Sequence, residues 1–173
     1  MIPELKLRPE KNGKGRRKEI MKDWKKELTE LFDEYRIIRS SQKDTLDDFN
    51  QFCESIVEPA FENLEDEFRE YGVRSKIIRI KGKSITFQIH FGKSRIDHFR
   101  YTLELPKKSV EMRLRLRLKG RKSRKDVRDE SIEPFLPDIP PQQVMNLEKE
   151  ILIKDVIAHY RDFIFSSEAA TEE

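Results

Sequence analysis

Apolar residues recur every three or four positions through the first part of the chain, the spacing of one face of an α-helix. This spacing predicts a helix over residues 17–39. The residues on its apolar face are Ile20, Trp24, Leu28, Leu31, Phe32, Tyr35 and Ile38. Residues 1–16 combine prolines and glycines with basic residues, so we expect a flexible basic N-terminal arm before the helix.

A second helical pattern runs from about residue 40 to residue 71. Ser41, followed three residues later by Asp44, is typical of a capped helix start. Pro59 lies inside the pattern and predicts a kink or a break, because proline lacks the N–H group of a helical hydrogen bond. Gly72 is placed to end the helix. The apolar residues of this helix are Leu46, Phe49, Cys53, Ile56, Ala60, Leu64, Phe68 and Tyr71.

The apolar period changes from about four residues to two after Gly72, which predicts β-strands. Gly82 and Gly92 are spaced as turns between consecutive strands. The predicted strands cover residues 74–80, 84–91, 97–105 and 109–118. Four alternating strands with short connections indicate an antiparallel meander with one apolar and one polar face.

The last third of the chain predicts a loop and a helix. Residues 119–141 are first basic and then rich in proline, so we expect an exposed loop. A helix over residues 141–165 follows, and the acidic tail 166–173 is expected to fray. The prediction is a single α+β domain over residues 17–165, with elements in the order ααββββα. Its four-stranded antiparallel meander sheet has the helices packed on one face.

Charge is strongly segregated along the 173 residues, although the net charge is only +3. Residues 1–26 carry +6, residues 27–71 carry −10, residues 72–128 carry +15 and residues 129–173 carry −8. Near-neutrality is therefore a cancellation between basic and acidic blocks, and the sheet region is the most basic of them.

The polar sheet face and the loop after it form the candidate binding site. The residues are Arg100, Arg113, Arg115, Arg117, Lys119, Arg121, Lys122, Arg124 and Lys125. Clustered cations repel one another, so something should offset them. Nucleic acid could do so through its phosphates, an acidic protein surface could do so, or the acidic helices with Glu104 and Glu111 could neutralise the face internally.

These patterns favour a non-catalytic binding or adaptor subunit that engages an anionic partner, either nucleic acid or an acidic protein surface. Nucleic-acid binding is weakened because no aromatic residue interleaves the cations, as base stacking requires. The alternative is a structural homo-oligomer assembled through the amphipathic helices 17–39 and 141–165. An enzyme with an unrecognised site is the third hypothesis.

Catalytic and metal signatures do not emerge from the sequence. It has no Gly-rich phosphate loop, no nucleophile elbow and no zinc-protease helix motif. A metal site of His90, Asp97 and His98 is geometrically conceivable, but histidines on neighbouring strands need no special cause, so we predict neither metal nor cofactor. Cys53 is the only cysteine; it excludes an internal disulfide and fits an inert core thiol.

The expected location is cytoplasmic, with no membrane partner. No apolar run approaches the roughly 20 residues that span a bilayer, and the first residues do not resemble a secretory signal. A nuclear location stays open because the basic run at 119–125 is also typical of a nuclear-localisation signal.

Overall fold

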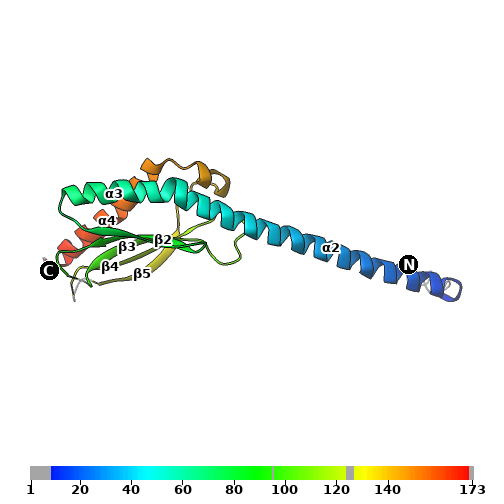
Figure 1. Ribbon diagram of the computed structural model, residues 1–173. Helices are drawn as coiled ribbons and strands as arrows, with labels where there is room; N and C mark the ends of the chain where they lie inside the picture. Colours follow the sequence, from blue (N-terminus) through cyan, green and yellow to red (C-terminus); the bar gives the residue numbers. More distant parts are fainter. Residues whose placement is uncertain (1–8, 95, 124–126, 172–173) are drawn as a thin grey trace. The chain divides into compact units, whose positions relative to one another are not determined.

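The computed structural model describes residues 9–94, 96–123 and 127–171 as an α+β structure (Figure 1). The chain divides into two compact units, Met1–Ser41 and Gln42–Glu173. A long first helix is followed by a five-stranded antiparallel sheet and a C-terminal helix. Among the helices of these residues, none combines the length and the apolar character needed to cross a membrane.

Helix α2 covers Pro9–Phe52 and is longer at both ends than the helix predicted over residues 17–39. It begins before residue 17 and continues past Ser40. Residues 9–16 of the predicted flexible arm are helical, and residues 1–8 lie outside the described part. Proline is tolerated in a first helical turn because its missing N–H would have no helical acceptor there. No proline or glycine stands near Ser41, so the capping-type pattern does not start a new helix.

The predicted break near Pro59 is confirmed by a change of hydrogen bonding. A π-helical turn, η1 (Cys53–Val57), separates α2 from α3 (Glu58–Glu70). The Glu58 N–H donates to the Cys53 carbonyl five residues back. Pro59 then occupies the first turn of α3. Gly72 follows the helix with a φ of 71°, which confirms it as the residue that ends it.

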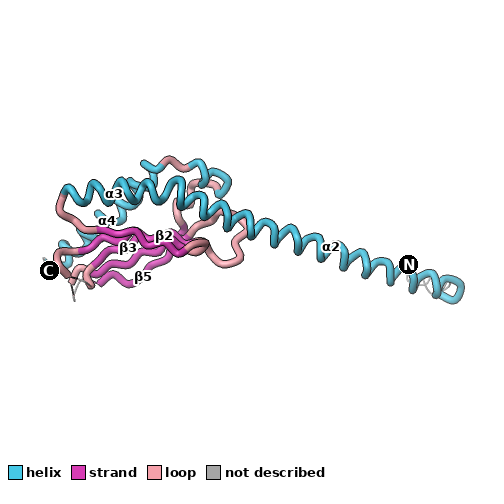
Figure 2. The backbone as a smooth tube through the Cα atoms, in the orientation of Figure 1, coloured by secondary structure: helices cyan, strands magenta, loops and turns pink. Residues whose placement is uncertain are grey.

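The sheet has five strands in sequential order, shown in magenta in Figure 2, where the sequence predicts four. Its strands are β1 (Ser75–Ile80), β2 (Ser84–His90), β3 (His98–Glu104), β4 (Arg115–Arg121) and β5 (Val127–Pro134). All neighbours are antiparallel, and Gly82 and Gly92 have positive φ in the first two connections, as predicted.

Two parts of the sheet differ from the prediction. The fourth strand begins at Arg115 instead of residue 109, because Lys108 has a φ of 61° and the backbone before Arg115 is irregular. Strand β5 lies inside the predicted loop 119–141. Its sequence VRDESIEP carries acidic and polar residues at most positions, as an outer strand can, so no apolar alternation marks it.

The C-terminal segment also differs from the single helix predicted over residues 141–165. Pro141–Asn146 forms a 3-10 turn, η2, and α4 runs from Lys149 to Thr171, so most of the predicted frayed tail is helical. Leu147 is extended between them. Residues 172 and 173 lie outside the described part.

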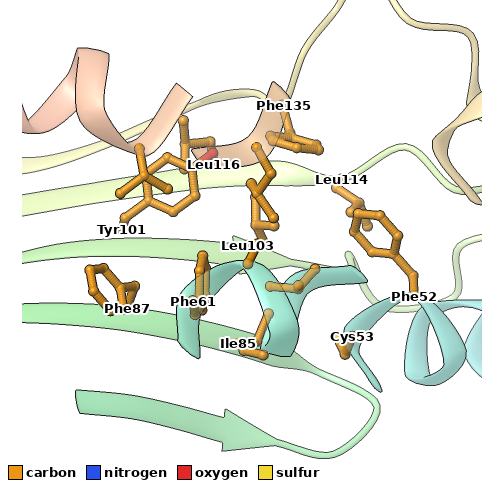
Figure 3. Packing of buried hydrophobic residues seen from close by; sticks show 14 of the residues in the cluster. Phe52, Cys53, Phe61, Ile85, Phe87, Tyr101, Leu103, Leu114, Leu116 and Phe135 are labelled. Carbon is orange, nitrogen blue, oxygen red and sulfur yellow. The ribbon is translucent and has the colours of Figure 1, made fainter. Parts of the chain in front are cut away.

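The core of the second unit lies between the sheet and its helices (Figure 3). Phe61 of α3 contacts Phe87 of β2, with ring centroids 5.2 Å apart, and meets Tyr101 of β3 edge-on. The helices cover one face of the sheet, as predicted, and side chains of opposite parity on the strands form the other face. We call this second surface the open face.

Candidate functional site

The open face carries the polar side chains that the sequence places there. Four residues of β4 stand directly opposite four residues of β3: Arg115 with Glu104, Arg117 with Thr102, Lys119 with Arg100, and Arg121 with His98. The apolar partners of this alternation, Leu116 and Leu118, are buried on the helix side. The structure therefore brings Arg100, Arg115, Arg117, Lys119 and Arg121 onto one surface.

Arg117 is the residue of this set that the protein neutralises most fully. Its Nε donates to a Glu104 carboxylate oxygen at 2.9 Å, and its Nη1 donates to Glu130 at 2.5 Å. The hydrogen bond from Arg117 lowers the pKa of Glu130 below its usual value. Glu130 lies on β5, the strand that the sequence did not predict. Internal neutralisation, one of the three explanations for the basic face, thus holds at Arg117.

Other predicted site residues are partly engaged. Arg121 lies 3.7 Å from Asp97, and the Nε of Arg100 donates to the Gln88 amide oxygen at 3.0 Å. Arg113 lies before β4 and pairs with Glu111 two residues away. Lys122 is partly buried. The predicted residues Arg124 and Lys125 lie outside the described residues.

Three exposed cations of the open face, Arg100, Arg115 and Lys119, form no ion pair within the described part of the chain. Lys119 also stands directly opposite Arg100, and like charges in that position destabilise a sheet. The described strands place no Phe, Tyr or Trp on the open face: Phe87, Phe99 and Tyr101 are fully buried under the helices. The surface offers charge without a stacking platform.

His90 of β2 and His98 of β3 are directly paired in the sheet, but they are not part of a metal-binding cluster within the described residues. Nδ1 of His98 lies 2.7 Å from the Ile96 carbonyl, which accepts its hydrogen bond. Burial lowers the pKa of both His90 and His98. Within the described residues, no group of three or more His, Cys, Asp or Glu side chains could hold a metal ion.

Cys53 is fully buried, as its place on the apolar stripe predicts. Burial raises the pKa of its thiol to about 12. A thiol with this pKa is almost entirely protonated at neutral pH, and only the thiolate is a good nucleophile. Its burial and raised pKa fit a core thiol.

A polar cluster that no local sequence pattern predicts lies beneath α4. The Tyr101 hydroxyl donates to Asp155 at 2.5 Å, and His159 Nε2 lies 3.6 Å from the same carboxylate and 3.5 Å from Glu133. Burial, and then the charge of Asp155, raise the pKa of Tyr101 well above its usual value. The spacing of Asp155 and His159 by four residues is a local signal in the sequence, whereas Tyr101 lies 54 positions before Asp155. The cluster attaches α4 to the sheet.

An apolar groove of about 430 Å³ lies between α3 and α4. Its lining residues include Phe68, Tyr71, Ile157 and Tyr160, and Tyr71 is largely exposed. Phe68 and Tyr160 meet edge-on at 5.5 Å between ring centroids. Its walls are mainly apolar, and Asn63 and Glu67 are the amide and carboxylate side chains among its lining residues.

The first unit carries an exposed apolar helix face. Every side chain from Asp23 to Ser40 is exposed. Six large apolar residues of this segment lie on one face of α2, and each is between 41% and 56% exposed. They are Trp24, Leu28, Leu31, Phe32, Tyr35 and Ile38, and we call them the α2 stripe. Their spacing in the sequence predicts a shared helix face, whereas their exposure comes from the structure.

Comparison with known proteins yields no relative: no family model, no curated protein and no solved structure matches this chain.

Proposed function

We propose that this chain is a non-catalytic assembly protein whose copies associate through the α2 stripe. The single observation that carries the proposal is the exposure of six large apolar side chains on one helix face. Scattered exposed apolar residues are normal on protein surfaces, but a contiguous apolar surface marks an interaction site. A surface helix normally turns such a face towards a core.

The energetics favour association. Full burial of a Leu, Ile or Phe side chain contributes about 1.5–3 kcal/mol, and the stripe residues retain roughly half of their surface for that purpose. Several such residues from each copy can together offset the roughly 4–15 kcal/mol lost when two molecules lose independent motion. The polar back of the same helix segment, which includes Lys26, Asp33 and Ser40, keeps the assembly hydrated.

The test is the mass of the protein by light scattering over a range of concentrations. We expect the wild type to exceed the mass of one chain, and Leu28→Glu with Leu31→Glu to return it to one chain. The matched control, Lys26→Glu with Ser40→Glu, places two new acids on the polar back and should keep the wild-type mass. Helical circular dichroism would verify that the variants fold. A wild type that stays at one chain at every concentration would contradict the proposal.

A second candidate function is binding of an anionic partner, nucleic acid or an acidic protein surface, at the open face. Its support is that Arg100 and Lys119 stand directly opposite each other, so that an anion would relieve their repulsion. Exposed Arg115, four residues before Lys119 on β4, extends the basic surface along the strand. Binding of a DNA duplex or a single strand should weaken steeply with salt, and the slope should fall by about one for each contacting cation removed.

The variant for this second candidate is Arg115→Glu with Lys119→Glu, measured by gel shift and by binding to polyglutamate. Arg117→Glu is unsuitable, because Arg117 already pairs with Glu104 and Glu130. Binding to polyglutamate alone would assign an acidic protein as the partner. Indifference of the wild type to both polyanions at low salt would reject the open face as a binding site.

A further inference from the structure

Five of the six α2 stripe residues occupy the core positions of a seven-residue coiled-coil repeat, and the sixth, Phe32, lies beside them at position e. With Leu28 at position a, the a positions are Met21, Leu28 and Tyr35, and the d positions are Trp24, Leu31 and Ile38. Three consecutive repeats therefore have large apolar residues at both core positions. A strict repeat of this kind makes a helix wind around a second helix.

The two flanks of the stripe carry opposite charge. On one side, position g holds Glu27 and Glu34; on the other, position e holds Lys25, Phe32 and Arg39. The cations of the e side lie against the stripe itself. Lys25 Nζ is 5.7 Å from the ring centre of Trp24, and the Arg39 guanidinium is 5.4 Å from that of Tyr35. The basic flank is thus placed where a second helix would meet it.

From this asymmetry we infer that the helices of two copies pair in parallel and in register, with Glu34 of each copy facing Arg39 of the other. The inference rests on the proposed self-association and adds its partner orientation. In a parallel pair, a g residue meets the e residue five positions later on the second helix, and Glu34 and Arg39 have that spacing.

An antiparallel pair would bring like charges together. In antiparallel packing, g positions face g positions, so with Leu28 opposite Leu31 of the second copy, Glu27 stands opposite Glu34. That arrangement also leaves Arg39 without an acidic neighbour. Within the described residues neither Glu34 nor Arg39 forms an ion pair. The nearby pair of Asp33 and Arg36, 3.9 Å apart, occupies positions f and b, away from the stripe.

Charge reversal distinguishes the two orientations by sign. Glu34→Arg and Arg39→Glu should each raise the dissociation constant of the dimer about tenfold, because each change breaks two attractive pairs and creates two repulsive ones. The double variant should return to within about threefold of the wild type. In an antiparallel dimer, Glu34→Arg would instead tighten association by facing Glu27. Asp33→Arg makes the same charge change at position f and should have little effect.

Cysteine cross-linking provides a second readout of the same geometry. A disulfide needs Cα atoms about 4.4–6.8 Å apart, which identical a positions reach only in a parallel, in-register pair. Tyr35→Cys alone should therefore form a covalent dimer under oxidation. An antiparallel pair would instead cross-link a mixture of Trp24→Cys and Tyr35→Cys chains. The native Cys53 should not interfere, because it is fully buried.

The outcomes separate the two proposals. A dimer that Glu34→Arg weakens, that the double variant restores and that Tyr35→Cys cross-links supports parallel pairing. A dimer that Glu34→Arg tightens, or that cross-links only in the mixture, overturns the orientation while self-association stands. A mass of three or more chains overturns the two-copy pairing. A protein that stays at one chain at every concentration overturns both proposals.

Discussion

Two regions of the molecule alternate apolar and polar residues in a regular pattern: helix α2 between Asp23 and Ser40, and strands β2 to β4. The helix repeats about every 3.6 residues and the strands every two. In the strands, the apolar set is fully buried: Ile85, Phe87, Phe99 and Leu118 have no exposed surface. In the helix, residues of the same chemical kind keep about half of their surface.

The difference shows what amphipathic periodicity does and does not specify. Periodicity fixes which side chains share a face, because that depends only on local backbone geometry. Whether the face is covered depends on another surface being available. In the second unit, the sheet and helices α3 and α4 provide that surface for each other, whereas the side chains of the α2 stripe are exposed.

The largest expected contrast is between two phenylalanines on helices. Phe61→Ala should cost about 3–5 kcal/mol in the free energy of unfolding, because Phe61 is fully buried against Phe87 and Tyr101. Phe32→Ala should change it by about 0.5 kcal/mol or less, because Phe32 is 55% exposed. Urea denaturation at low protein concentration would measure both. Comparable losses would show that the stripe already packs within the chain.

Substitution of Gly120 in β4 should change the free energy of unfolding by an intermediate amount, and the direction of the change is informative. An alanine Cβ at Gly120 would lie 2.3 Å from a ring carbon of Phe163 on α4. Strand propensity alone predicts that Gly120→Ala stabilises the protein, because glycine weakens a strand. The close packing predicts the reverse, a loss of about 1–3 kcal/mol.

The control for Gly120→Ala is the same change in a Phe163→Leu background. If the clash with Phe163 is the cause, the loss should shrink there, with a coupling energy of at least about 0.5 kcal/mol in thermal or urea unfolding. An equal loss in both backgrounds would assign the cost to the backbone.

The smallest contrast is between neighbouring arginines of the open face. Arg117→Ala should cost up to about 1 kcal/mol, and the cost should diminish with salt, because Arg117 pairs with Glu104 and Glu130. Arg115→Ala should be nearly neutral, because Arg115 is exposed and outside any ion pair among the described residues. Equal costs at low salt would mean that the open face acts as one charge network rather than through Arg117.

The sequence by itself determined the local features of this protein. Helical spacing placed Trp24, Leu31 and Ile38 on one face, and the period of two placed the first three strands. Proline and glycine marked the interruption before Pro59 and the end of the helix at Gly72. All of these depend on residues a few positions apart, and backbone sterics and hydrogen bonding act over that range.

Only the tertiary structure decided which residues from distant parts of the chain meet. Strand β5 has no apolar alternation, and its pairing with β4 is what places Glu130 on Arg117. A hydrogen bond links Tyr101 to Asp155, which lies 54 positions later in the chain. Gly120 falls in a predicted loop, and only the structure places it in a strand directly against the Phe163 ring. The same limit applied to the candidate site. The sequence shows that Arg117 is charged, but its pairing with Glu104 and Glu130 depends on contacts between different strands. A pairing between distant segments depends on loop closure and on the whole core, so no short pattern encodes it.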